Sequence, residues 1–199
     1  MWFTVKKINN YIWAFAEFKH FEEVISYLVI GKKKALLVDT GLGIKDIKKE
    51  VEKITDLPII VINTHSHFDH VGGNSLFDNV INVSTKNRIV VEPFEFNVIK
   101  TPGHSPDSVC FYEKNRKWLF SGDTLYSGPI YLHLRESNVN DYLSSLIDLM
   151  KIDIKEIYPA HNDFNFPKIN IARIYKSLTK RNKRTKKIVI DKETSLLLK

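Results

Sequence analysis

The stretch "NTHSHFDHVGGN" at residues 63–74 places three histidines and an aspartate within six positions, although the chain has only seven histidines. It overlaps the end of the apolar run "IIVIN", which is typical of a short buried strand. Because alternate residues of an extended chain point to the same side, His65 and His67 are expected to face one way. Asp69 and His70 follow where a glycine pair lets the chain turn.

Imidazole and carboxylate groups are the ligands that zinc and similar divalent metals prefer. Four more such residues share one context, since each stands at the end of a strand-like apolar run and precedes a glycine or a turn. They are Asp39 in "LLVDTG", His104 in "TPGHSPDS", Asp123 in "LFSGDTLY" and His161 in "YPAHND". Active sites gather at such strand ends because the sheet is rigid while the loops vary. The pattern predicts a metal centre.

The rest of the chain is typical of an ordinary globular protein. Its 199 residues are 43% hydrophobic and 27% charged, which favours one domain over residues 1–199. No apolar run approaches the roughly 20 residues of a membrane span, and the start has no apolar core of a secretory signal. Cys110 is the only cysteine, and "SVCFY" predicts a buried structural thiol. We therefore expect a cytoplasmic protein.

Charge is distributed unevenly along the chain. Residues 168–199 hold eleven Lys and Arg against Asp191 and Glu193, whereas the whole chain has a net charge of +7. The C-terminal segment therefore carries all of the basic excess. It is either a solvated surface helix with a lysine-rich tail, or a patch for anionic substrates, nucleic acid or acidic lipids.

Short runs rich in β-branched and aromatic residues predict strands in both halves of the chain. The expected strands cover 2–8, 11–18, 24–30, 34–40, 59–63, 80–83, 96–100, 108–112, 117–121 and 156–160. Helical spacing of apolar residues predicts helices over 43–55, 139–152 and 166–180. The pattern by itself indicates a mixed α and β domain.

Taken together, these motifs resemble those of the metallo-β-lactamase superfamily of binuclear metallohydrolases. Over roughly residues 25–165 they follow the superfamily's order, which is Asp39, then His65-x-His67-x-Asp69-His70, then His104, Asp123 and His161. The resemblance implies an α/β fold, a four-layered αββα sandwich with the metals at one edge of the sheets.

The resemblance also implies roles for single residues. His65, His67 and His104 would bind a first metal. Asp69, His70 and His161 would bind a second, with Asp123 bridging both and Asp39 either orienting a ligand histidine or supporting the loop. Two Zn²⁺ ions are expected, with iron or manganese as alternatives. A hydroxide between the metals would attack an ester-like carbonyl, and Asp69 would help to steer it.

The segment after Asp123 bears on the substrate. Tyr126 is similar to a tyrosine of lactonases that open acyl-homoserine lactones, where it donates to the substrate carbonyl. The alternative is that Tyr126 packs against the sheet edge. "GDTLYSGPIY" also resembles a branch with acyl-CoA thioesterases, and "GDTL" is shared with glyoxalase II. Tyr131, His133 and Arg135 either line the mouth of the site or have a surface or packing role.

Two alternatives from other classes remain. A mononuclear iron persulfide dioxygenase would use counterparts of His65, His104 and Asp123 on the same fold. A nuclease or phosphodiesterase would use the basic segment 168–199, although family nucleases usually carry an extra insertion or domain. The preferred prediction is a binuclear zinc hydrolase of a small-molecule thioester or lactone. The oligomeric state stays open.

Overall fold

The structure is a computed structural model that describes residues 1–182 and 184–199. The chain divides into two compact units, Met1–Val98 and Ile99–Lys199, which are described separately below. Within the described ranges, no helix combines the length and the apolar character needed to cross a membrane. That the whole chain is one domain stays a prediction.

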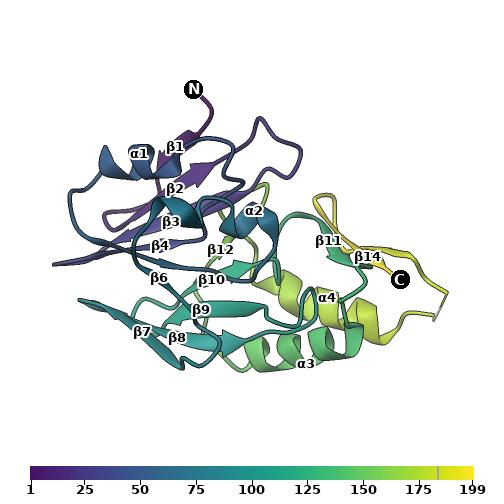
Figure 1. Ribbon diagram of the computed structural model, residues 1–199. Helices are drawn as coiled ribbons and strands as arrows, with labels where there is room; N and C mark the ends of the chain where they lie inside the picture. The colour runs from purple at the N-terminus through teal and green to yellow at the C-terminus, as the bar shows by residue number, and fades with distance from the viewer. Residues whose placement is uncertain (183) are drawn as a thin grey trace. The chain divides into compact units, whose positions relative to one another are not determined.

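A six-stranded sheet forms the centre of the first unit (Figure 1). Its strands, in spatial order, are β1 (Thr4–Lys7), β2 (Ile12–Ala16), β3 (Ile25–Ile30), β4 (Ala35–Val38), β5 (Ile59–Ile62) and β6 (Val80–Ile81). The first four strands pair antiparallel, whereas β4, β5 and β6 run parallel. A hairpin of β7 (Arg88–Val91) and β8 (Phe94–Lys100) follows, and β8 continues into the second unit.

Burial explains why β4 and β5 are continuous apolar runs. Helix α1 (Ile47–Glu52) buries Ile47 and Val51 against Leu37 of β4 and Val61 of β5. Because that face of the sheet is covered, outward-pointing positions also take aliphatic residues. The helix is shorter than the predicted 43–55, because the residues just before it form a loop that closes against Gly72.

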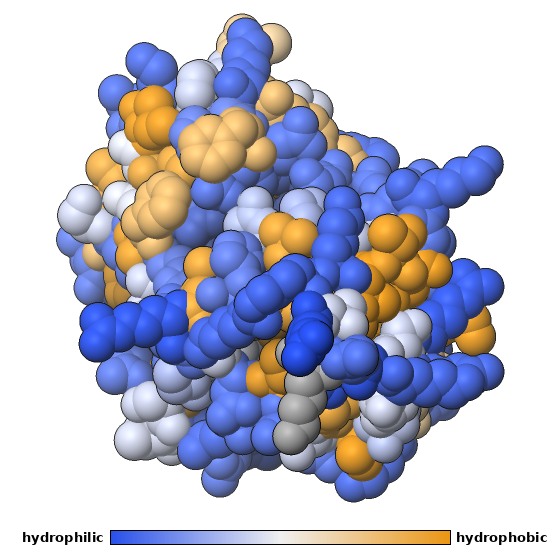
Figure 2. Space-filling model, turned by 90° about the vertical axis from the view of Figure 1, so that its right-hand side faces the viewer, coloured by the Kyte–Doolittle hydropathy of each residue, from blue (hydrophilic) through white to orange (hydrophobic). Residues whose placement is uncertain are grey.

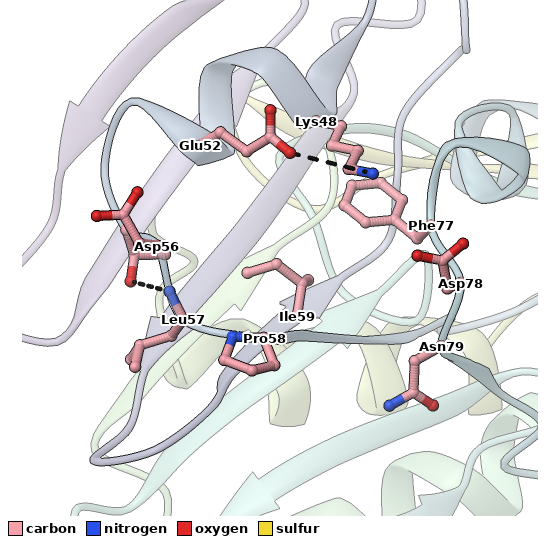
Figure 3. A pocket seen from close by; sticks show the side chains of 10 residues that line it. Lys48, Glu52, Asp56, Leu57, Pro58, Ile59, Phe77, Asp78 and Asn79 are labelled. Carbon is pink, nitrogen blue, oxygen red and sulfur yellow. Dashed lines mark hydrogen bonds and ion pairs between the residues drawn. The ribbon is translucent and has the colours of Figure 1, made fainter.

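A pocket of about 570 Å³ opens where β5 begins (Figure 3). It lies between α1 and the segments on either side of β5, and a Lys48–Glu52 pair at 4.0 Å stands on its rim. Its lining residues are Lys48, Glu52, Thr55, Asp56, Leu57, Pro58, Ile59, Phe77, Asp78 and Asn79. The predicted ligand His65 follows the other end of β5. The pocket and His65 are therefore at opposite ends of this strand.

The second unit combines two groups of strands with two helices. Its strands are β9 (Val109–Glu113), β10 (Trp118–Gly122), β11 (Gly128–Leu132), β12 (Glu156–Pro159), β13 (Lys187–Val189) and β14 (Thr194–Leu198). Strand β10 pairs antiparallel with β9 and parallel with β12. Helices α3 (Val139–Met150) and α4 (Ile169–Thr179) lie side by side (Figure 1) and bury Leu146, Leu149, Ile174 and Leu178 in one core.

The C-terminal residues form regular strands rather than an irregular lysine-rich tail. Strand β14 lies between β11, with which it runs parallel, and β13, with which it runs antiparallel. Burial alternates along β14, as it does in a strand with one covered face. Thr194, Leu196 and Leu198 are buried, while the residues between them are half-exposed. The expectation of a solvated tail is wrong for β14, whereas Lys187 and Val189 of β13 are exposed. Lys183, part of the predicted basic segment, lies outside the described residues.

Candidate metal centre

The predicted ligands of the first unit follow β5 directly. His65 and His67 leave the strand, and His67 is the N-cap of the short helix α2 (Phe68–Val71), which carries Asp69 and His70. We call His65, His67, Asp69 and His70 the first donor set. All but the half-exposed His67 are buried, and one ring nitrogen of His65 lies within 4.8 Å of a ring nitrogen of His67 and of His70. The first unit thus brings all four side chains together.

Asp39 supports this set from the end of β4. One carboxylate oxygen accepts the Thr64 N–H at 2.8 Å, and the other lies 2.8 Å from the Thr64 hydroxyl and 2.9 Å from His70 Nδ1. An ionised carboxylate only accepts, so Nδ1 of His70 carries the proton. This leaves Nε2 as the ligand atom, the arrangement that is usual for metal-binding histidines. Asp39 therefore holds both Thr64 and His70, and its role toward a bound metal stays a prediction.

The turn after β4 brings its backbone against the first donor set. Asp39 has a φ of 61°, a left-handed conformation that non-glycine residues seldom adopt. Thr40 then donates its N–H to the carbonyl of His70 at 2.8 Å, and the carbonyl of Gly41 accepts the N–H of Gly72 at 3.0 Å. A Cβ added to Gly72 would lie 2.3 Å from the backbone of Leu42. The loop 39–43 and the histidine segment are therefore fitted together.

The predicted ligands of the second unit also follow strand ends. His104 comes after β8, Asp123 follows β10 and His161 follows β12. Strands β10 and β12 run parallel, so their carboxyl ends lie together and bring Asp123 beside His161. We call His104, Asp123 and His161 the second donor set, and all three are buried.

Asp123 stands between the two histidines of this set. Its Oδ1 lies 2.9 Å from His161 Nε2, and its Oδ2 lies 3.4 Å from His104 Nε2. On the far side of its ring, His104 Nδ1 lies 2.8 Å from the carbonyl oxygen of Tyr131 in β11, to which it donates. His104 is therefore held as His70 is, with Nε2 as the ligand atom.

Tyr126, the predicted substrate contact, is 4% exposed. Its hydroxyl donates to the carbonyl of Pro129 at 2.6 Å, and its ring lies 5.0 Å from the ring of His161. Burial raises the pKa of Tyr126 well above the usual value, and the charge of Asp123 adds to this. The hydroxyl already has a backbone partner, which fits the packing alternative better than the donor role.

The three residues predicted for the mouth of the site or for the surface lie in or after β11. Tyr131 and His133 form an edge-on ring pair with centroids 5.2 Å apart, and Arg135 follows. His133 and Arg135 are exposed, and Tyr131 is half-buried. Tyr131 contributes to the second donor set through its backbone carbonyl rather than through its ring.

Each donor set has the chemistry of a metal site. Several buried imidazoles and carboxylates stand within a few ångströms of one another, and both sets have a histidine whose Nδ1 donates to protein oxygen. Burying carboxylates costs free energy unless their charge is compensated, and a divalent cation compensates it. The residues present therefore fit zinc or a similar ion.

Some supporting groups were not singled out from the sequence. Thr64 binds Asp39 through both its N–H and its hydroxyl, Thr40 holds His70, and the carbonyl of Tyr131 holds His104. Thr64 lies inside the histidine motif, and Thr40 follows Asp39 directly, so their places in the sequence were a usable signal. The role of the Tyr131 carbonyl could not be predicted from the sequence, because every residue type has a backbone carbonyl.

Comparison with known proteins gives a consistent result. A family model described as the metallo-beta-lactamase superfamily matches residues 22–88 and 84–161. The acyl-coenzyme A thioesterase MBLAC2 of Homo sapiens is 24% identical over 226 residues, covering 80% of this chain and 81% of that protein. The hydroxyacylglutathione hydrolase of Francisella tularensis subsp. novicida is 28% identical over 183 residues, covering 81% of this chain and 66% of that protein.

Solved structures show the same fold at low sequence identity. A metallo-beta-lactamase from Pontibacter korlensis superposes with a TM-score of 0.76 at 18% identity, covering 90% of this chain and all of that one. The metallo-beta-lactamase FIM-1 from Pseudomonas aeruginosa, in its mono-zinc form, gives a TM-score of 0.73 at 16% identity over 90% of this chain.

Proposed function

The chain belongs to the metallo-β-lactamase superfamily, and from that premise we propose that it is a two-zinc hydrolase of thioesters. The solved structures confirm the predicted fold. With its His and Asp donor sets, the chain is a metal hydrolase of this superfamily. The number and kind of metal ions and the thioester substrate are the proposal.

We assign the seven residues of the two donor sets to two metal ions. His65, His67 and His104 would hold one ion, Asp69, His70 and His161 would hold the other, and Asp123 would bridge them. The family's motif order supports this assignment, as do the contacts within each set. Asp123 presents one oxygen to each of its two histidines. Asp39 and the Tyr131 carbonyl fix the Nδ1 protons of His70 and His104.

Two bound zinc ions would supply a water molecule of lowered pKa and would polarise the carbonyl of the substrate. Asp69 would accept a hydrogen bond from the attacking water and would orient it toward the carbonyl carbon. The C–O bond forms and the C–S bond breaks, and the proton of the water ends on the leaving sulfur or in solvent.

The substrate class is supported by two observations. One relative is named an acyl-coenzyme A thioesterase and another a hydroxyacylglutathione hydrolase, whose named substrate carries its acyl group on the sulfur of glutathione. Asp123 stands where β-lactamases with a thiolate ligand carry cysteine, which argues against penicillin as the main substrate.

The basic segment 168–199 favours a thioester with an anionic carrier. Its eleven basic residues attract negative charge, and strand β13, which begins at Lys187, belongs to the same three-stranded sheet as β11. Tyr131 of β11 holds His104. Figure 2 shows the side of the molecule on which the C-terminal segment lies, and hydrophilic side chains predominate there. We propose that this charge draws phosphate-bearing thioesters toward the site.

Metal analysis combined with a substrate panel tests the proposal. We expect about two zinc ions per chain, and faster hydrolysis of coenzyme A thioesters than of acyl-homoserine lactones or phosphodiesters. Asp123→Ala is expected to lose metal at one or both positions together with the activity. Asp107→Ala, which removes a carboxylate outside the donor sets, is the matched control.

Three outcomes would contradict the proposal. One iron per chain with thiol-dependent oxygen uptake would identify a persulfide dioxygenase. Hydrolysis of nucleic acid, with binding that falls steeply as salt rises, would identify a nuclease. Full activity of Asp123→Ala would remove the metal mechanism altogether.

A further inference from the structure

We propose that Glu17 is a positioning residue for the first donor set, because its buried carboxylate fixes the loop 39–43 on which Asp39 and His70 depend. The inference rests on the proposed function, since it concerns the same metal centre. Glu17 lies just after β2 in "FAEFKH", outside all of the metal motifs.

The carboxylate of Glu17 bonds to the loop directly. The side chain is 1% exposed, and Oε1 accepts the backbone N–H of Leu42 at 2.8 Å. The other oxygen, Oε2, accepts the indole N–H of Trp2. The backbone of Glu17 is also anchored, because its N–H donates to the carbonyl of Val24 at 2.9 Å. Glu17 thus links the β2–β3 turn to the loop after β4.

The loop is shaped to receive this carboxylate. Gly41 has a φ of +69°, and a Cβ at that position would stand 2.1 Å from Oε1 of Glu17. No side chain fits there unless the carboxylate moves away. A glycine is therefore required at position 41 both by the backbone conformation and by the contact with Glu17.

From Leu42 the link continues to the metal ligands through backbone bonds. The carbonyl of Gly41 accepts the N–H of Gly72, and Thr40 donates its N–H to the carbonyl of His70. A shift of Leu42 would carry Gly41 and Thr40 with it, and would move both of these bonds. The side-chain hydrogen bonds of Glu17 go to Trp2 and Leu42, so its structural support reaches the first donor set through this loop.

The electrostatic surroundings of Glu17 also connect it to the first donor set. Burial raises the pKa of Glu17 and the nearby negative charge of Asp69 adds to this, whereas the bonds from Trp2 and Leu42 and the charge of His20 lower it. The buried carboxylate of Glu17 is close enough to Asp69, a predicted ligand, for the two groups to interact electrostatically. Both carboxylate oxygens accept a hydrogen bond, one from the indole of Trp2 and one from the loop at Leu42, so the side chain is fixed at both oxygens.

Metal affinity is the decisive measurement, because it does not depend on knowing the substrate. Zinc affinity would be measured by competition with a chelator, and the cobalt-loaded protein would be compared by visible absorption. We expect Glu17→Ala to lower zinc affinity by about 10-fold to 100-fold, as lost support of a ligand typically does, and to change the cobalt spectrum. Glu17→Gln keeps an oxygen for Leu42 N–H and should recover much of the affinity.

Glu113→Ala is the matched control. Glu113 is also a buried glutamate, and it accepts a backbone N–H, that of Arg116, at 2.6 Å in a turn of the second unit. We expect this variant to melt at a lower temperature without metal, yet to bind zinc with unchanged affinity.

Gly41→Ala serves as a second variant should Glu17→Ala fail to fold. The added Cβ displaces the carboxylate, so this variant should lose zinc affinity as Glu17→Ala does. Unchanged affinity and cobalt spectra in Glu17→Ala and Gly41→Ala, with a loss of melting temperature like that of Glu113→Ala, would leave Glu17 a purely structural residue. Absence of metal binding by the wild type would overturn the proposed function as well, so the two failures are distinguishable.

Discussion

His70 Nδ1 lies 2.9 Å from a carboxylate oxygen of Asp39, and both side chains are almost completely buried. The same carboxylate also accepts hydrogen bonds from the backbone N–H and the hydroxyl of Thr64. Asp39, at the end of β4, therefore fixes the ring of His70. It also fixes the start of the segment that carries the other predicted ligands of the first donor set. Its charge also makes the imidazole a better metal ligand.

Asp39→Asn is expected to lower zinc affinity by about 10-fold to 100-fold. An amide offers one oxygen where the carboxylate offers two, so the three donors can no longer all be satisfied. Zinc titration against a chelator measures the effect. Asp46→Asn is the control, because Asp46 is an aspartate that caps α1 by accepting the N–H of Lys49. Equal affinities of wild type and Asp39→Asn would contradict the supporting role.

Tyr126→Phe separates the two interpretations of Tyr126. Because its hydroxyl donates to the Pro129 carbonyl, we expect a loss of about 1 kcal/mol in the free energy of unfolding and little change in kcat. A donor to the developing oxyanion would instead cost about 100-fold to 1,000-fold in kcat. Tyr142→Phe is the control, since Tyr142 is also buried and donates to a backbone carbonyl, that of Thr124.

The single thiol gives a pH-dependent prediction. Burial raises the pKa of Cys110 from 9.0 to about 11, so the folded state keeps its proton to a higher pH than the unfolded state does. This contribution to stability is complete below pH 9 and is lost as the pH rises toward 11, at up to about 1.4 kcal/mol per pH unit. Urea unfolding of wild type and Cys110→Ala between pH 8 and pH 10.5 measures it. A difference between them that stays constant with pH would contradict the prediction.

Charge reversal tests the role of the basic segment. Lys186 and Lys187 are exposed at the start of β13, and the double change to glutamate is expected to raise KM for a coenzyme A thioester by roughly threefold to tenfold. The effect should shrink at high salt and be absent for an uncharged N-acetylcysteamine thioester. Lys32 and Lys33, exposed in the turn after β3, provide a control with the same change in charge. Equal effects on both substrates would contradict an electrostatic role.

The positions of the predicted ligands could be inferred from the sequence for a simple physical reason. Each stands where a buried run gives way to a turn, and such points in parallel strands meet at one end of a sheet. Asp123 and His161 meet in this way, at the ends of β10 and β12. Their roles toward metals came from the resemblance to a family rather than from the pattern.

Other parts of the molecule were beyond sequence reasoning. Strand β11 was missed because Gly128 and Pro129 are typical of turns, and β14 because it follows a run of lysines. Glu17 showed no pattern at all, since its importance arises from a contact with Leu42 far along the chain. Such contacts depend on tertiary packing and are absent from local propensity.

The parallel pairing of β11 with β14 also affects when the metal centre matures. The carbonyl that holds His104 belongs to β11, whose neighbour comes from residues 194–198. Pairings between distant segments form slowly, because a long stretch of chain must first be ordered. On a ribosome, the histidines of the first donor set emerge long before this strand. Loading of the complete metal centre is therefore expected to follow synthesis, because His104 gains its backbone partner only when β11 is in place.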